Sequence, residues 1–271
     1  MMNPYELASE AAKELRQRSG VDKFDVAVVL GSGWKEGAGA LGEPSSVIPT
    51  SDLTGFFKPT VAGHQGQILA VEYAGLTVAL LAGRVHLYEG HTAHEVAHPI
   101  RTLVAAGAQK IVLTNACGGI DPAHGPGTVS LIRDHINLTS TSPMEGEIPP
   151  DQFGSRFVDL SNLYDSDARA RIQSIHALPE GVYAGFRGPH YETPAEIKMA
   201  KAMGASLVGM STVLEAIAAR HLGAQVTGLG LISNFAAGVV PGGLNHLEVL
   251  EAGQRAAATL GALLKEIIPV L

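Results

Sequence analysis

The 271-residue sequence has one cysteine and one tryptophan, and none of its apolar runs approaches the length of a membrane span. The single cysteine, Cys117, excludes an internal disulfide framework and is typical of a reducing compartment. A membrane-spanning helix needs about 20 apolar residues, and the charged N-terminal segment lacks the apolar core of a secretory signal. These absences predict a cytoplasmic protein with no membrane segment.

Positive charge is also scarce. The chain carries 19 Lys and Arg against 26 Asp and Glu, for a formal net charge of −7, and its basic residues form no cluster. Proteins that bind nucleic acid generally present a basic patch. No nucleic-acid partner is therefore expected.

Short apolar runs alternate with helical patterns along the whole chain, which predicts the α/β class. No repeat and no linker-like segment interrupts this alternation, so one domain covering residues 1–271 is expected. Two helices have clear signals: Thr193-Pro194 is a start signal, and Pro269 ends an amphipathic C-terminal helix. The polar, proline-rich stretch 139–166 is expected to be a long functional loop. The expected strands are 24–30, 67–73, 77–83, 110–116, 128–134, 181–186, 206–210 and 226–233.

Residues 94–98 match the H-E-x-x-H pattern of zinc peptidases, in which two histidines one helical turn apart bind the metal. A third protein ligand is missing, because Arg101 and Val104 stand where the metzincin extension needs glycine and histidine. No glutamate follows Glu95 until Glu145, and Pro99 disturbs the helix that would hold the ligands. We therefore expect no metal site, and we expect His91, His94 and His98 to be solvated.

Four other stretches predict an anion site. Gly31-Ser32-Gly33 and the segment 115–119 each follow an apolar strand, and Ser211 stands where a helix begins. Backbone amides at such positions approach an anion closely. Arg84 follows a further strand, and its guanidinium suits phosphate. Each feature alone is also compatible with an ordinary strand-to-helix turn. Glu36 stands where the dinucleotide motif G-x-G-x-x-G needs its third glycine.

Eight motifs are spread over nearly the whole chain, and their combination is more specific than its parts. They are GSG (31–33), AGHQG (62–66), GRVHLYEGH (83–91), VLTNACGG (112–119), LIRDHINLT (131–139), GPHYETPAE (188–196), VGMSTVLEA (208–216) and LISN (231–234). In these motifs the sequence resembles the trimeric purine nucleoside phosphorylases, in particular the bacterial branch. The resemblance implies a distorted mixed β-sheet, partly barrel-like and surrounded by helices, in a homotrimer. It implies reversible phosphorolysis of purine nucleosides to a free base and pentose 1-phosphate, a reaction of purine salvage.

The resemblance also implies residue roles. Phosphate would be bound by Ser32, His64, Arg84, His86, Ala116 and Ser211. Ribose would be bound by Tyr88, Met210 and His246, and the base by Tyr191, Glu192, Val208 and Asn234. Asn234, Glu192 and His86 would carry the catalysis, and Phe153 would reach into a neighbouring subunit's site. Cys117 is expected to be a packing residue, because phosphate is the nucleophile. Inorganic phosphate is a co-substrate, and no cofactor is expected.

Glu192 and Asn234 set the expected substrate class. A carboxylate accepts hydrogen bonds from N1–H of hypoxanthine or guanine, whereas adenine has no proton on N1. Substrates are therefore expected to be 6-oxopurine nucleosides such as inosine and guanosine. A methylthioadenosine phosphorylase, a hydrolytic nucleosidase and a catalytically silent nucleoside-binding protein remain alternatives.

Overall fold

The computed structural model describes residues 2–61, 66–122, 124–146, 148–242, 244 and 246–271, and for 246–250 only the backbone. The strands are β1 (Val26–Leu30), β2 (Ser46–Pro49), β3 (Gln67–Tyr73), β4 (Leu76–Ala82), β5 (Lys110–Gly119), β6 (Val129–Asn137), β7 (Glu180–Gly185), β8 (Leu207–Gly209) and β9 (Gln225–Phe235). The α-helices are α1 (Pro4–Ser19), α2 (Lys35–Ala38), α3 (Ala93–Ala105), α4 (Ser166–Ile175), α5 (Pro194–Ala202), α6 (Val213–His221) and α7 (His246–Ile267). Within these ranges, no helix is long and apolar enough to cross a membrane.

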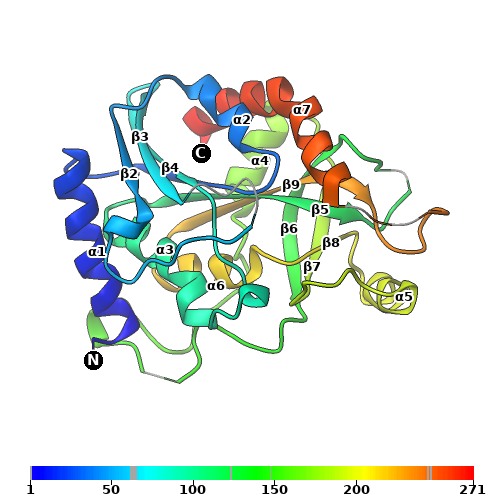
Figure 1. Ribbon diagram of the computed structural model, residues 1–271, viewed down its shortest axis with the longest axis horizontal. Helices are drawn as coiled ribbons and strands as arrows, with labels where there is room; N and C mark the ends of the chain where they lie inside the picture. The colour runs from blue at the N-terminus through cyan, green and yellow to red at the C-terminus, as the bar shows by residue number, and fades with distance from the viewer. Residues whose placement is uncertain (1, 62–65, 123, 147, 243, 245) are drawn as a thin grey trace.

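The strands join one mixed sheet in the order β2-β3-β4-β1-β5-β8-β7-β6-β9. A further parallel pairing joins β9 back to β5, so β5, β8, β7, β6 and β9 form a closed ring. The expected α/β class with a distorted, partly barrel-like mixed sheet is confirmed. Figure 1 shows the upright pair β6 and β7 beside the long, crossing β5 and β9.

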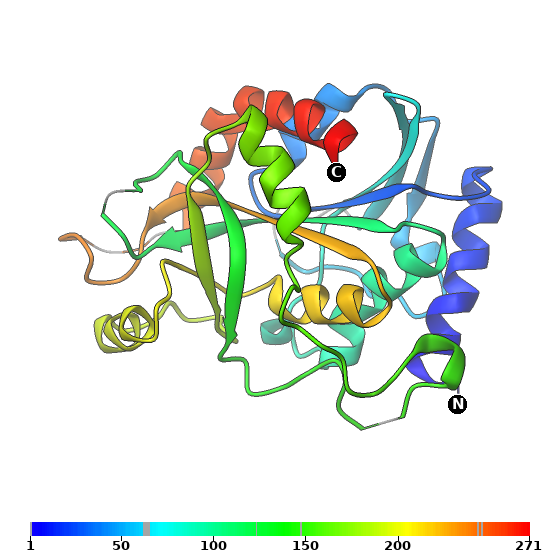
Figure 2. The ribbon, with the colours of Figure 1, turned by 180° about the vertical axis from the view of Figure 1, so that it is seen from behind.

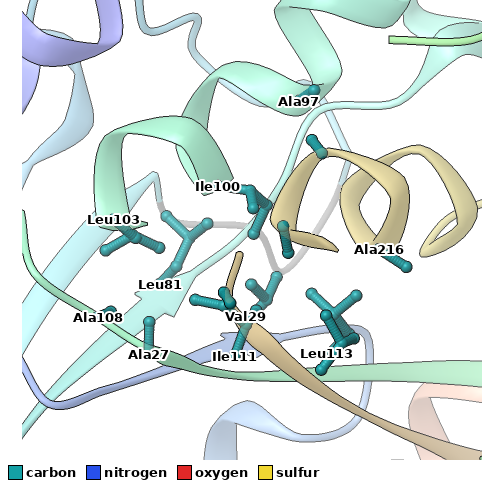
Figure 3. Close-up of a cluster of buried hydrophobic side chains, with 14 of the residues drawn as sticks. Ala27, Val29, Leu81, Ala97, Ile100, Leu103, Ala108, Ile111, Leu113 and Ala216 are labelled. Carbon is teal, nitrogen blue, oxygen red and sulfur yellow. The ribbon is translucent and has the colours of Figure 1, made fainter. Parts of the chain in front are cut away.

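Helices cover both faces of the sheet because the central strands are apolar on both sides. On β1, Val26, Val28 and Leu30 pack with α7, whereas Ala27 and Val29 pack in the core that includes α3 and α6. Alternate residues of a strand point to opposite faces, so a strand buried on both sides is a continuous apolar run. Figure 3 shows Ala27 and Val29 beside Ile100 of α3 and Ala216 of α6. Figure 2, seen from behind, shows α4 crossing near the ring, and α5 packs on β7 and β8 through Ile197 and Ala200.

The parallel strands β4, β1, β5 and β9 run in one direction, so their carboxyl ends lie at one edge. In open α/β sheets this is the edge where ligands bind. Local signals at the helices agree with the sequence. Thr193 caps α5 in a capping box with Glu196, with Pro194 at the first helical position, and α7 ends at Ile267 before Pro269. The described residues 139–146 and 148–165 form a loop with one short 3-10 helix, Asp151–Phe153, and Ser166 begins α4.

Candidate active site

One pocket collects nearly all of the residues for which the sequence predicted a role. It lies between the carboxyl ends of the parallel strands and the segment 208–211, which leads from β8 to the start of α6. The predicted site residues that line it are Ser32, Arg84, His86, Tyr88, Ala116, Tyr191, Glu192, Val208, Met210, Ser211 and Asn234. The fold therefore brings together segments that are separated by up to two hundred residues in sequence.

Three predicted residues are not among these lining residues. His64 lies outside the residues that the structure describes, and His246 is described only as the backbone at the start of α7. Phe153 lies elsewhere, in a groove where its ring stacks on Tyr5 with 5.1 Å between ring centroids.

A bulge in β9 directs two consecutive side chains into the pocket. Cys117 of β5 pairs with Ile232 and Gly118 pairs with Asn234, so Ser233 is an extra residue in β9. In a regular strand, adjacent side chains would point to opposite faces, and a bulge changes this direction locally. Both Ser233 and Asn234 line the pocket. The Ser233 hydroxyl donates to Asn234 Oδ1 over 2.8 Å and thereby fixes the orientation of the amide.

The turn after β1 brings the Ser32 backbone close to β5. The amide of Gly31 donates to Thr114 Oγ1 over 3.0 Å, and Thr114 Oγ1 donates to the Val29 carbonyl over 2.7 Å. A Cβ on residue 31 would collide with the Thr114 carbonyl. Glycine is therefore required at this position by the close approach of the two backbones.

Arg84 is buried between Ser211 and a glutamate. Its Nη1 donates to Ser211 Oγ over 3.1 Å, and its Nε lies 3.2 Å from Glu215 Oε1. The side chains of Arg84 and Glu215 are both 3% exposed. A buried guanidinium in a pocket with serine hydroxyls can bind an oxyanion through charge-assisted hydrogen bonds.

His86 is held by Glu89. Both its backbone amide and its ring Nδ1 contact Glu89 Oε1, at 2.8 and 2.9 Å, and its ring stacks on Tyr88 with 4.6 Å between centroids. Burial, with a smaller effect of Arg84, lowers the pKa of His86, so the imidazole is neutral at pH 7. Burial of Glu89 opposes its ionisation, but hydrogen bonds from His86 and Thr60 lower its pKa to about 2. A carboxylate only accepts, so Nδ1 carries the proton and Nε2 is an acceptor.

Glu192 is a buried carboxylate suited to accept a hydrogen bond from a ligand. It is 7% exposed, and its Oε1 has no hydrogen-bond partner among the described residues. Burial, reinforced by the negative charge of Glu196, raises its pKa above the usual carboxyl value. A buried carboxylate oxygen needs a donor. Tyr191 beside it is 36% exposed and lines the pocket, so it is not a core aromatic.

Cys117 has the environment of a packing residue. It is 3% exposed, and burial raises the pKa of its thiol to about 12. A nucleophilic cysteine needs a lowered pKa, so this thiol is unsuited to attack.

The expectation that the histidines near residue 94 are solvated is wrong for His98. Thr92 begins α3, and His98 is 3% exposed, with its Nε2 donating to the Thr54 carbonyl over 2.9 Å. His94 is half-buried, and its Nε2 contacts the Glu145 carbonyl at 2.7 Å. Each ring therefore ties α3 to a different loop. In the described parts of the chain, no three His, Cys, Asp or Glu side chains are grouped as metal ligands.

Several residues that shape the site were not predicted from the sequence to have a role, among them Glu89, Glu215 and Thr212. Glu89 and Glu215 each stand three residues after a helix-start residue, the spacing of a capping box. The spacing predicts helix capping by the two glutamates, but it does not predict the contacts of Glu89 with the His86 ring or of Glu215 with Arg84. Leu244, another lining residue, follows a glycine-rich segment without any distinguishing pattern.

The family model of the phosphorylase superfamily matches residues 25–269. The purine nucleoside phosphorylase of Mycobacterium tuberculosis is 51% identical over 267 residues, which cover 98% of this chain and 97% of the relative. The chain therefore belongs to the purine nucleoside phosphorylases.

Solved structures agree with this assignment. Isoform 2 of the Schistosoma mansoni enzyme, in complex with cytosine and ribose-1-phosphate, has a TM-score of 0.89 and 35% identity, covering 99% of each chain. The purine nucleoside phosphorylase of the same organism in complex with inosine has a TM-score of 0.89 and 30% identity, covering 98% of this chain and 96% of the other.

Proposed function

We propose that this protein catalyses the reversible phosphorolysis of 6-oxopurine ribonucleosides and deoxyribonucleosides, including inosine and guanosine. The products are the free base and the pentose 1-phosphate. The observation that carries the proposal is one pocket that combines a buried arginine with serine hydroxyls and, separately, a buried carboxylate oxygen that has no hydrogen-bond partner in the described part of the chain. The arginine and the hydroxyls suit phosphate, and the carboxylate oxygen suits a base with an N–H group.

Phosphate would be bound by Ser32, the Ala116 amide, Ser211, Arg84 and His86. The neutral His86 accepts at Nε2, which suits the O–H of monohydrogen phosphate, while Arg84 and the hydroxyls donate to its other oxygens. His64 is proposed to contribute to the same anion. Positioned in this way, a phosphate oxygen attacks the anomeric carbon as the glycosidic bond breaks.

The breaking bond leaves positive charge on the sugar and negative charge on the purine. Phosphate stabilises the former, and Asn234 stabilises the latter by donating from Nδ2 near purine N7 or O6. One hydrogen of this amide is already used, because Nδ2 donates to the Phe235 carbonyl over 2.9 Å, and we propose that the second is donated to the base. Glu192 accepts from purine N1–H. Preorganised donors of this kind stabilise charge that develops in the transition state.

The remaining contacts orient the substrate. Tyr88, Met210 and His246 are proposed to bind the ribose, and Tyr191 and Val208 to contact the base. Side chains of the pocket meet each charge that develops, so we propose that the reaction needs phosphate as co-substrate and no metal or other cofactor. We further propose a cytoplasmic homotrimer that acts in purine salvage, in which Phe153 contacts the neighbouring subunit's substrate.

The test is hypoxanthine release from inosine by EDTA-treated protein, with and without phosphate. Release that requires phosphate and is insensitive to EDTA is expected. Release without phosphate would identify a hydrolase, and binding without turnover would identify a binding protein. Parallel assays with methylthioadenosine address the alternative nucleoside, which is expected to react poorly because Glu192 faces its acceptor N1.

A further inference from the structure

We propose that Glu215 is a positioning residue for the phosphate site, and that it fixes Arg84 and Ser211 together through its two carboxylate oxygens. The inference rests on the proposed function, because it takes the corner of the pocket at Arg84 and Ser211 to be where phosphate binds. Glu215 does not itself line that pocket. It lies behind it in the first turn of α6 and is 2% exposed.

The two oxygens of Glu215 have different tasks. Oε1 lies 3.2 Å from Arg84 Nε. Oε2 accepts from the backbone amide of Thr212 over 2.9 Å. Arg84 in turn donates from Nη1 to Ser211 Oγ over 3.1 Å. Glu215, Arg84, Ser211 and Thr212 thus form a closed circuit of contacts, and a displacement of one member moves the donors intended for phosphate.

Thr212 is the point at which this circuit constrains the backbone. Its φ of 73° and ψ of −47° lie where a β-branched residue is a genuine outlier. Three side chains hold it there: the Glu215 carboxylate accepts from its amide, Asn115 Nδ2 donates to its Oγ1 over 2.8 Å, and the Ser211 hydroxyl lies 3.2 Å from its Oγ1. Such a conformation persists only when its surroundings impose it. Here it turns the chain sharply between Ser211 and α6, which sets the direction of the Ser211 hydroxyl.

Only a carboxylate of this length satisfies both contacts. Arg84 Nε, which forms an ion pair with Oε1 without the geometry of a hydrogen bond, and the Thr212 amide, which donates to Oε2, both present an N–H group to Glu215, so both atoms of the bridging group must be acceptors. Glutamine has one acceptor, and its NH2 would face one of the two donors. Aspartate is shorter by one methylene group. A role in capping α6 alone would need only one oxygen, so capping does not explain the full geometry.

The circuit also sets the charge of the site. Glu215 neutralises Arg84, so the cation at the phosphate corner is part of an ion pair. Recognition then depends on the direction of Arg84 Nη1 and Ser211 Oγ. Because Ser211 Oγ accepts from Arg84, its own proton can be donated to a phosphate oxygen. Misdirection of these donors is expected to weaken phosphate binding more than nucleoside binding.

The experiment measures steady-state kinetics of the full chain with inosine and phosphate varied independently. For Glu215→Gln we expect a phosphate KM raised at least about tenfold, the size of effect typical for a lost hydrogen bond to a charged group, and an inosine KM within about twofold of wild type. Glu6→Gln is the matched control, because Glu6 completes a capping box with Asn3 in α1 and contacts no arginine in the described contacts. It is expected to leave both KM values unchanged.

A second pair of variants avoids the burial of an unpaired charge. Thr212→Gly tolerates a positive φ but loses the hydroxyl that Asn115 holds, and it should raise the phosphate KM. Thr212→Ser keeps the hydroxyl, so its phosphate KM should stay close to that of wild type. An unchanged or lowered phosphate KM in Glu215→Gln overturns the proposal, since those results fit a purely structural or counter-ion role. If that variant does not fold, an unchanged KM in Thr212→Gly overturns it.

Thermal shift with inorganic phosphate alone separates this inference from the proposed function. Wild-type protein that phosphate stabilises against unfolding, with the stabilisation reduced in Glu215→Gln, supports the inference whether or not inosine is turned over. A wild-type protein without phosphate-dependent turnover contradicts the proposed function instead. Equal stabilisation of both proteins by phosphate contradicts the inference alone.

Discussion

Asn234 is held ready to donate by the bulge in β9 and by the Ser233 hydroxyl. In Asn234→Ala the negative charge on the departing purine loses its donor, so kcat should fall by about 10²–10³, the usual cost of removing one such donor. Binding of phosphate should be unaffected, which thermal shift with inorganic phosphate checks. Turnover close to that of wild type would remove Asn234 from the mechanism.

Glu192 predicts a dependence of substrate capture on pH. Its carboxyl has a raised pKa, chiefly because it is buried, and the ionised form is the stronger acceptor for purine N1–H, because protonation turns one of its two oxygens into a donor. As pH falls through that raised pKa, the proton occupies the acceptor, so kcat/KM for inosine should decline at a higher pH than the usual carboxyl value would give. His86, whose pKa is lowered by burial, is protonated at acid pH as well.

The variant Glu192→Gln distinguishes these two contributions. It should lower kcat/KM for inosine and abolish the part of the acid decline that Glu192 causes, while the part due to His86 remains. The check is a pH–rate profile for both proteins from neutral to acid pH. An identical acid decline in the two profiles would show that Glu192 does not titrate in the free enzyme.

At the scale of elements, the contact between α7 and the turn after β1 is unusually close. Gly253 of α7 packs directly on Gly33, so that a Cβ on residue 253 would collide with the Gly33 Cα. Alanine normally stabilises a helix interior relative to glycine by about 1 kcal/mol. Here Gly253→Ala should instead lower Tm and, by displacing the Ser32 turn, raise the phosphate KM.

The exposed neighbouring position provides the control for this prediction. Gln254→Ala adds a good helix former to the same turn of α7 without a contact to β1, and it should leave both Tm and KM nearly unchanged. The check is the Tm from thermal unfolding and the phosphate KM from initial rates, measured for both variants and the wild type. A Gly253→Ala protein more stable than wild type would show that the two segments can separate at little cost.

The sequence predicted most strands well because they are apolar on one or both faces. The run 67–73 coincides with β3, and 226–233 falls within β9. The strand β2 was not predicted, since only Ile48 of its four residues is buried and the segment shows no apolar alternation. A pattern of apolar residues predicts a strand only where the strand is buried, and β2 is mostly exposed.

The predicted pocket residues came mostly from family resemblance, and the physical reading of turns gave only the phosphate corner. Glu215 could not be assigned from sequence because its partner Arg84 is 131 positions away and nothing local to either residue indicates the pairing. The bulge at Ser233 was equally hidden, because it depends on the register between β5 and β9. Contacts between distant segments decide these features.

At the scale of the whole molecule, Phe153 tests the proposed oligomer. If its ring completes a neighbour's site, Phe153→Ala should raise the inosine KM roughly tenfold, as truncating an interface aromatic commonly does, and leave the phosphate KM unchanged. Light scattering after size exclusion measures the mass. A monomer with full activity would contradict both the trimer and the role of Phe153.

Co-expression of two defective chains gives a sharper check. In a mixed oligomer, a Phe153→Ala subunit supplies an intact pocket and an Asn234→Ala subunit supplies the missing ring, so some sites should recover the wild-type inosine KM. A mixture that behaves as the sum of the separate variants would place Phe153 outside the neighbour's site.

The pairing of β9 with β5 has a consequence for the behaviour of the protein at high concentration. An open nine-stranded sheet would have two outer strands with unpaired backbone groups, to which another chain could add a strand. Ring closure removes one of them, and in the described sheet the outer strand left is β2, which is four residues long and ends in Pro49. A short outer strand with a proline is a poor template for strand addition. The closed ring therefore protects the native protein against aggregation through its sheet edges.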